Sequence, residues 1–203
     1  MKIKFKLFLL LLVSGLFSKD LPFYDESYAV IIGINNYQSE EFSNLAFAVE
    51  DARSISDLLI NKLGYKVKNV HLILDEEATR ENILTRLYHI AKNAQKKDRI
   101  LIFFSGHGET LSFPTGGEVG YLVPVNAKPD NLIVTGISME EFKKISDLTI
   151  ANQVLYLVDA CYSGIMTVGK GIQRKEFDND EEYIKYVTSL PSKQIITAGG
   201  KDD

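Results

Sequence analysis

Two short glycine-containing segments of this 203-residue chain carry the residues best suited to nucleophilic chemistry. Ser105-Gly-His-Gly108 contains one of the three histidines, and Asp159-Ala-Cys-Tyr-Ser-Gly164 contains the only cysteine. A free thiol has a pKa of about 8.5 and is mostly protonated at neutral pH, so it needs a base to become a strong nucleophile. A neighbouring imidazole can take the thiol proton and later protonate a leaving amine. His107 and Cys161 therefore form a candidate catalytic dyad.

The glycines beside these residues suit the same chemistry. They let a substrate backbone approach closely and leave backbone N–H groups to face an oxygen that becomes negatively charged during acyl transfer. We expect the N–H groups of Gly108 and Cys161 to supply this oxyanion site. Taken singly, each segment has a plainer interpretation, because a lone cysteine after a strand is usually packed in a core and a histidine between glycines can be a turn residue. Their meeting at one place would favour catalysis.

The hydrophobic pattern places both segments at the ends of buried strands. Apolar, β-branched runs predict five strands, at residues 28–34, 70–74, 100–104, 154–158 and 194–198. His107 follows the third run and Cys161 follows the fourth. The carboxyl ends of parallel strands lie on one edge of a sheet, with neighbouring strands about 5 Å apart. The topology alone therefore predicts that the histidine and the cysteine come together.

Helical patterns alternate with these strands. Apolar residues recur at three- and four-residue steps from Leu45 to Leu63, and Gly64 ends the pattern. Thr79 is expected to cap a second helix, and Ser138 with Glu141 forms a capping-box pattern before a third. The second helix has a four-membered apolar stripe: Ile83, Leu87, Ile90 and Ala94. Residues 116–125 are expected to form a hairpin or a loop.

This alternation predicts an α/β domain with a mainly parallel central sheet and helices on both faces. The pattern stops just after the fifth strand, without a helix to cover that edge of the sheet. An uncovered edge favours unwanted association. One interpretation is therefore a domain that is incomplete at its C-terminal end, as a fragment of a longer polypeptide.

The first 18 residues resemble an export signal. Lys2, Lys4 and Lys6 precede an apolar run at 7–13, and small residues up to Ser18 offer a cleavage point. We expect a signal peptide at 1–18, a linker at 19–27 and the folded domain at 28–203, in a protein that is periplasmic or secreted. The alternative is an uncleaved anchor, the only case in which we expect membrane contact, although the run is short for a membrane span.

Composition excludes several other classes of function. The formal net charge is −4, so no broad basic surface is available for nucleic acid. A single cysteine excludes an intrachain disulfide and a multi-cysteine zinc site. The acidic run at 178–182 could bind a cation weakly, but a solvated loop is the favoured interpretation. We expect neither a metal nor a cofactor, and the sequence does not indicate an oligomeric state.

The two segments resemble known motifs. Phe103-Phe-Ser-Gly-His-Gly108 and Val158-Asp-Ala-Cys-Tyr-Ser-Gly164 are similar to the histidine and cysteine motifs of metacaspases and bacterial caspase-like peptidases. His107 precedes Cys161 by 54 residues, compared with about 50 in caspases. The similarity extends from Tyr28 through Ala198 and includes the helix start Leu45-Ala-Phe-Ala-Val-Glu-Asp-Ala52. It implies a caspase-hemoglobinase fold, a three-layer sandwich, and a cysteine-type endopeptidase acting through the His107–Cys161 dyad.

The resemblance also bears on specificity. Metacaspases cleave polypeptides after arginine or lysine, and their substrate-binding pocket positions match Asp51, Ser105 and Asp159. Asp159 lies two residues before Cys161 and so on the same strand face, and carboxylates there would pair with a basic side chain. The simpler interpretations are a helix-dipole partner for Asp51 and a structural hydrogen-bond acceptor for Asp159. Cleavage after acidic residues is disfavoured, because no arginine matches the pocket.

The chain departs from the metacaspase pattern at one place. Calcium-binding aspartates are expected after a proline-valine pair, but Pro124-Val125 is followed by Asn126 and Ala127. The resemblance therefore does not predict activation by calcium. The alternative function is a caspase-like module that binds peptides without turnover, as part of a larger signalling protein.

Overall fold

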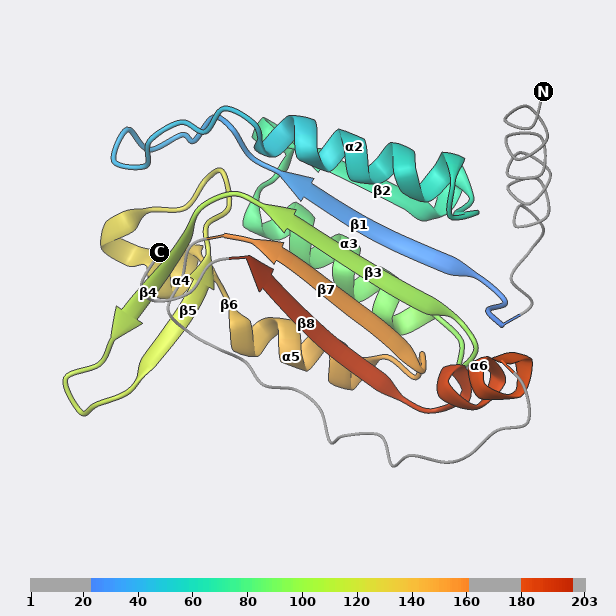
Figure 1. Cartoon of the computed structure of the whole chain (residues 1–203). Coiled ribbons are helices and arrows are strands. Elements are labelled where there is room, and N and C mark those ends of the chain that lie inside the picture. The colour runs from blue at the N-terminus through green and yellow to red at the C-terminus, as the bar shows by residue number, and fades with distance from the viewer. Residues whose placement is uncertain (1–22, 161–179, 199–203) are drawn as a thin grey trace, which may run out of the picture.

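The computed structural model describes residues 23–160 and 180–198. Cys161 and the first 18 residues lie outside these ranges. A five-stranded sheet forms the centre of the domain (Figure 1), and all neighbouring strands are parallel. Its strands, in spatial order, are β2 (Val70–Leu74), β1 (Ser27–Gly33), β3 (Arg99–Ser105), β7 (Gln153–Asp159) and β8 (Ser192–Ala198). All five predicted strands are confirmed, with shifts of at most two residues at their ends.

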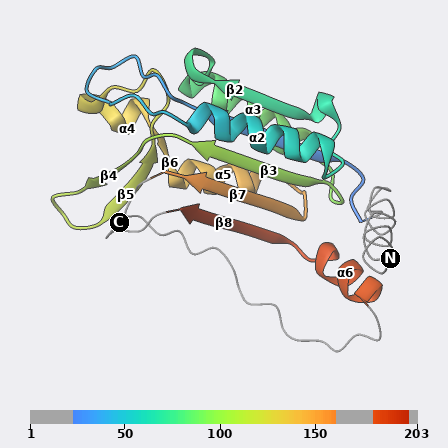
Figure 2. The same ribbon diagram turned by 45° about the horizontal axis from the view of Figure 1, so that its top comes forward.

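Helices cover both faces of this sheet, as predicted. Helix α2 (Ala48–Asn61) lies on one face, and α3 (Arg80–Asn93) with α5 (Met139–Leu148) lies on the other. Figure 2 shows this arrangement from a second direction. The three-layer α/β sandwich expected from the sequence is therefore confirmed.

The central strands are apolar on both faces because both faces are covered. On β1, Val30 and Ile32 pack in a buried apolar cluster with residues of α3 and α5. Ala29 and Ile31 point to the other face and pack toward α2. Such burial explains the near-continuous apolar run that predicted this strand. The α2 side is less completely covered at β8, where Ile196 is 56% exposed.

The predicted helix starts are confirmed at two of three places. The Thr79 side chain accepts a hydrogen bond from the Asn82 N–H, and Ser138 and Glu141 form a complete capping box. Helix α2 begins later than its apolar pattern indicates, at Ala48, because the Val49 N–H, which would bond the Leu45 carbonyl in a longer helix, donates to the Asn35 side-chain oxygen at 3.1 Å. The prediction that Leu45 and Leu63 belong to this helix was wrong, since it ends at Asn61.

A three-stranded antiparallel sheet projects from the carboxyl end of β3. It consists of β4 (Gly108–Ser112), β5 (Glu118–Leu122) and the short β6 (Ile137–Ser138). The hairpin was predicted for 116–125 but begins at Gly108. Gly116 and Gly117 occupy its tip with φ angles of +89° and +98°, a region that favours glycine.

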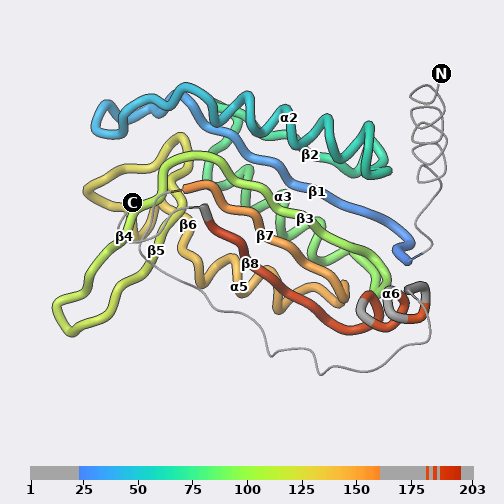
Figure 3. The backbone as a smooth tube through the Cα atoms, in the orientation of Figure 1, coloured from blue at the N-terminus to red at the C-terminus, as the bar shows by residue number. Residues whose placement is uncertain are grey.

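The remaining elements connect these layers. Helix α6 (Asp180–Ser189) leads into β8, and the Asn152 side chain donates a hydrogen bond to the Ser189 carbonyl. The prediction of a loop for the acidic run was wrong from Asp180 onward, since these residues begin α6. Figure 3 traces the backbone through all of these elements. Short helical segments are α4 (Leu132–Thr135), η1 (Val67–Asn69), η2 (Asp75–Glu77) and η3 (Pro129–Asn131). Within residues 23–160 and 180–198, no helix combines the length and the apolar character needed to cross a membrane.

Candidate active site

The carboxyl ends of the central strands are aligned at the edge where the sequence predicted a site. Gly33 of β1 pairs with Ser105 of β3, which pairs with Asp159 of β7. One further hydrogen bond runs from the Ile34 N–H to the Ser105 carbonyl at 3.1 Å, and another from the Gly106 N–H to the Asp159 carbonyl at 3.2 Å. The strands that lead into the two predicted motifs therefore end side by side.

His107 is held in place through both its backbone and its ring. Its N–H donates to the Tyr37 hydroxyl at 2.7 Å, and its carbonyl accepts from the Val123 N–H at 3.0 Å. The imidazole lies against the rings of Tyr37 and Phe42, with centroid separations of 4.9 and 6.1 Å. Its Nε2 lies 2.6 Å from the Ser43 carbonyl oxygen.

The Ser43 contact selects the tautomer of the neutral imidazole. A carbonyl oxygen can only accept a hydrogen bond, so Nε2 must carry the hydrogen. Nδ1 then has the lone pair and can act as the base. The histidine therefore has one nitrogen committed to the protein and the other available for proton transfer.

The backbone of Gly108 suits its predicted role at an oxyanion site. The Val123 N–H donates to the His107 carbonyl, so residues 107 and 123 occupy a hydrogen-bonded position of the antiparallel ladder. Hydrogen-bonded and non-hydrogen-bonded pairs alternate, which makes Gly108 and Leu122 a non-hydrogen-bonded pair. The Gly108 N–H is therefore directed away from β5, on the outer strand of the small sheet.

Cys161, predicted as the nucleophile and as the second oxyanion donor, lies outside the described residues. Strand β7 ends at Asp159, and the next residue, Ala160, is buried at 4% exposure. Asp159, two residues before the cysteine, is paired with Ser105, two residues before the histidine.

The three predicted pocket positions lie at the same edge and on the α2 side of the sheet. Alternation along β3 and β7 directs Ser105 and Asp159 to the face that holds Leu101 and Leu155. Asp51 is in the first turn of α2, and this turn packs on Gly33, where an added Cβ would lie 2.5 Å from the Ala48 carbonyl oxygen. Asp51 and Asp159 are exposed, whereas Ser105 is 4% exposed. Two carboxylates are thus accessible here, while the serine hydroxyl is buried.

The loop at residues 34–47 packs against the histidine ring, a role that no sequence pattern predicted. The Asp75 carboxylate accepts hydrogen bonds from the N–H groups of Asn35 and Asn36, at 2.7 and 3.0 Å. A further hydrogen bond, from the Gln38 N–H to the Val125 carbonyl, holds the other side of Tyr37. The Ser43 carbonyl could not be found from the sequence, because every residue has a carbonyl and only the fold selects one.

The residues after Pro124-Val125 have structural roles. Asn126 accepts a hydrogen bond from the Arg80 N–H at 3.1 Å through its side-chain oxygen, and Ala127 is buried. No group of three or more histidine, cysteine, aspartate or glutamate side chains suited to a metal occurs in the part of the chain that the structure describes.

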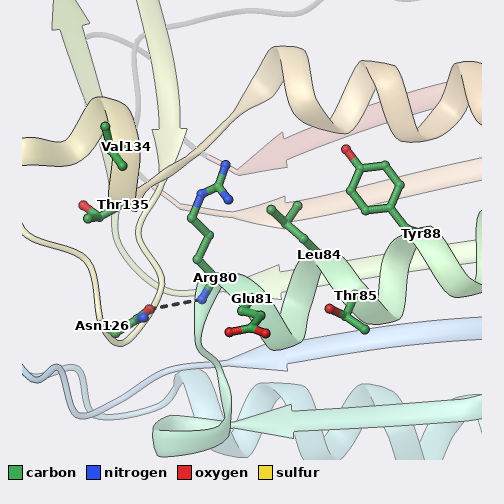
Figure 4. A pocket seen from close by; sticks show the side chains of 8 residues that line it. All are labelled: Arg80, Glu81, Leu84, Thr85, Tyr88, Asn126, Val134 and Thr135. Atoms are coloured by element: carbon green, nitrogen blue, oxygen red, sulfur yellow. Dashed lines mark hydrogen bonds between the residues drawn. The ribbon is translucent and has the colours of Figure 1, made fainter.

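A separate hollow of about 410 Å³ lies beside α3 and α4 (Figure 4). The Arg80 side chain on its wall is already engaged, because its guanidinium contacts Glu141 at 2.6 Å and the Gly136 carbonyl at 2.9 Å. None of its lining residues belongs to the predicted site. These residues are Arg80, Glu81, Leu84, Thr85, Tyr88, Asn126, Val134 and Thr135.

Comparison with known families gives one match over most of the chain. The sequence profile described as the caspase domain matches residues 26–199. Metacaspase-1 of Eremothecium gossypii is 28% identical over 146 residues, which cover 67% of this chain and 31% of that protein. Metacaspase-6 of Arabidopsis thaliana is 24% identical over 187 residues, which cover 85% of this chain and 48% of that protein. The chain thus spans less than half the length of either relative.

A similar fold occurs in a solved structure. The crystal structure of protein GSU0716 from Geobacter sulfurreducens superposes with a TM-score of 0.58 at 19% identity. The match covers 69% of this chain and 52% of that one. At this identity the likeness concerns the fold alone.

Proposed function

Because this chain belongs to the caspase domain family, we propose that it is a cysteine-type endopeptidase with Cys161 as nucleophile and His107 as proton-transfer partner. The observation that carries the proposal is the pairing of Ser105 with Asp159. This pairing brings the strand that precedes the histidine beside the strand that precedes the cysteine. The hydrogen bond from His107 Nε2 to the Ser43 carbonyl supports the same chemistry, because it leaves Nδ1 as the base.

The proposed reaction has two stages. In the first, the Cys161 thiol proton passes to His107 Nδ1, and the thiolate sulfur bonds to the carbonyl carbon of the scissile peptide. The N–H groups of Gly108 and Cys161 would stabilise the resulting oxyanion. The C–N bond then breaks, the leaving amine takes the proton from Nδ1, and a thioester remains. In the second stage, water gives a proton to Nδ1 and attacks the thioester, which releases the acid and restores the thiol.

We further propose that the substrates are polypeptides cleaved after arginine or lysine. Asp51 and Asp159 are accessible at the edge where the scissile bond would lie, and their carboxylates can pair with a guanidinium or an ammonium group. Ser105 would contribute less directly, because its side chain is buried beneath this surface.

A peptidyl electrophile with arginine beside the reactive group tests this function. We expect it to modify Cys161 stoichiometrically and to block cleavage of arginine peptides, whereas an otherwise identical probe with aspartate should react much more slowly. Cys161→Ala should neither react nor cleave. A wild type that reacts with neither probe and cleaves no peptide would instead be a binding module without turnover. Preferred reaction with the aspartate probe would contradict the proposed specificity.

We also propose that the protein is exported. The proposal rests on the basic, apolar and small-residue pattern of the first 18 residues. Mass spectrometry of the protein from its native host should find a mature chain that starts at about residue 19. An intact N-terminus in a cytosolic fraction would contradict this proposal.

A further inference from the structure

Tyr37 lies in the loop between β1 and α2, and its neighbours are fixed on both sides. The preceding residues, Asn35 and Asn36, are held by the Asp75 carboxylate. The following residue, Gln38, donates its N–H to the Val125 carbonyl at 3.0 Å. This double attachment places the tyrosine ring between the loop and the end of β3, where it is partly buried against two apolar clusters.

The Tyr37 hydroxyl accepts a hydrogen bond from the His107 N–H that the Val123 carbonyl would normally accept in the ladder. Residues 107 and 123 stand at a hydrogen-bonded position of the ladder, where two backbone hydrogen bonds normally form. Only the bond from the Val123 N–H to the His107 carbonyl is made. The second donor, the His107 N–H, is turned to the Tyr37 hydroxyl at 2.7 Å. The ladder therefore ends at His107, and Tyr37 sets the direction in which this residue leaves it.

The residue before the histidine is shaped to admit this hydroxyl. A Cβ added at Gly106 would lie 2.8 Å from the Tyr37 hydroxyl oxygen and 3.0 Å from the Phe104 ring. Alanine at this position would force the hydroxyl away from the His107 N–H. Gly106 is thus needed for the tyrosine hydroxyl to approach the His107 N–H closely.

The tyrosine ring also supports the imidazole itself. The centroids of the Tyr37 and His107 rings are 4.9 Å apart with planes tilted by 42°. Burial raises the pKa of Tyr37 well above its usual value, so the hydroxyl stays neutral throughout the working pH range. A group that does not titrate there is suited to hold a base in place rather than to exchange protons with it.

We propose that Tyr37 is a positioning residue for His107, acting through the backbone N–H and the ring face so that Nε2 meets the Ser43 carbonyl and Nδ1 is left to serve as the base. This inference rests on the proposed peptidase function for its catalytic consequence. Its structural content, the dependence of the imidazole geometry on the Tyr37 hydroxyl, stands separately and can be measured separately.

Tyr37→Phe keeps the ring and removes only the hydroxyl. We expect kcat for an arginine peptide to fall by about 10- to 100-fold with KM nearly unchanged, because a small misplacement of a catalytic group is costly whereas the substrate pocket is intact. Tyr156→Phe is the matched control, since it also removes a buried hydroxyl, one that contacts Ser146 and Phe142 within the core. This control should lose stability but keep kcat.

A second readout does not require activity. The chain has three histidines, so their ring ¹⁵N and ¹H signals can be assigned by substitution. In Tyr37→Phe, the His107 ring signals should shift, while those of His71 and His89 stay in place. If the wild type proves inactive, the peptidase proposal fails and these spectra still decide the role of Tyr37.

Gly106→Ala provides an independent variant. It should reproduce the shift of the His107 signals, and combining it with Tyr37→Phe should cause less than the sum of the two separate effects, because both act on one contact. Tyr37→Phe with unchanged kcat and unchanged His107 signals would overturn the proposal. Equal losses of kcat in Tyr37→Phe and Tyr156→Phe would also overturn it, since they would show only general destabilisation.

Discussion

The carboxyl edge of the main sheet and the layer formed by α3 and α5 are built in contrasting ways. At the edge, His107 is held by a hydroxyl and two backbone groups, and the side chains of Asp51 and Asp159 are exposed. In the layer, apolar side chains such as Phe142 and Ile83 are fully buried. The difference indicates that the layer stabilises the fold by burying apolar side chains, whereas the edge holds polar groups in a defined geometry.

The largest expected effect concerns the edge. His107→Ala should lower kcat by about 1,000-fold or more, because nucleophile and base act as a unit. The unfolding midpoint should hardly change, since the imidazole is only partly buried. His89→Ala, an exposed substitution on α3, is the control and should keep full activity. Steady-state kinetics and thermal unfolding of both variants would measure the effects on activity and on stability separately. A fully active His107→Ala would contradict the catalytic role of the edge.

A substitution in the layer should have the opposite pattern. Phe142 is fully buried, and its ring packs edge-on against Tyr156 with centroids 5.3 Å apart. Phe142→Ala should reduce the free energy of unfolding by about 3–5 kcal/mol, because it leaves a cavity. Ile133→Ala, at a 62% exposed position on α4, should change it by less than about 0.5 kcal/mol. Equal costs in denaturant unfolding would argue against a dominant α3–α5 core.

The exposed carboxylates of the edge, Asp51 and Asp159, are expected to affect substrate selection and not the chemical step itself. Asp159→Asn should cost about 2–5 kcal/mol of transition-state binding for arginine peptides, because the bound basic side chain loses its charged partner. Matched peptides with a neutral residue should be affected much less. The values of kcat/KM for both peptides measure this difference. Asp57→Asn, an exposed change farther along α2 from Asp51, should leave both unchanged. A uniform loss for both peptides with Asp159→Asn would indicate a structural role.

The smallest expected effect is a pH dependence of stability that arises from His71, on the face of β2 that packs toward α3. Burial, followed by the charges of Arg86 and His89, lowers the pKa of His71 below its usual value of 6.5. The unfolded chain therefore binds a proton more readily than the folded one, and stability falls as pH drops below about 6.5. His71→Gln should unfold with a shallower dependence of Tm on pH between about 7.5 and 5 than the wild type. Parallel curves would show that this histidine does not contribute.

The fold could be predicted from the sequence because its signals are local. Runs such as Tyr28–Ile34 are apolar throughout, since both faces of the strand are covered, and the Ser138–Glu141 capping box needs only four consecutive residues. The start of α2 could not be predicted in this way. Leu45 fits the helical pattern, but the Val49 N–H that its carbonyl would accept in a helix is taken by the Asn35 side-chain oxygen, a contact that depends on how the loop turns back.

The sequence by itself determined the residue types and the topology that brings two motifs to one sheet edge. An α/β alternation and the parallel direction of strands are enough to place the segments after β3 and β7 side by side. Only the tertiary structure decided how the histidine is held. His107 Nε2 donates to the Ser43 carbonyl, and the His107 N–H donates to the Tyr37 hydroxyl. Both acceptors lie in a loop that is anchored by Asp75, far along the chain. Hydrogen bonds between residues so distant in sequence leave no periodic pattern, because each depends on the positions of both backbones at once.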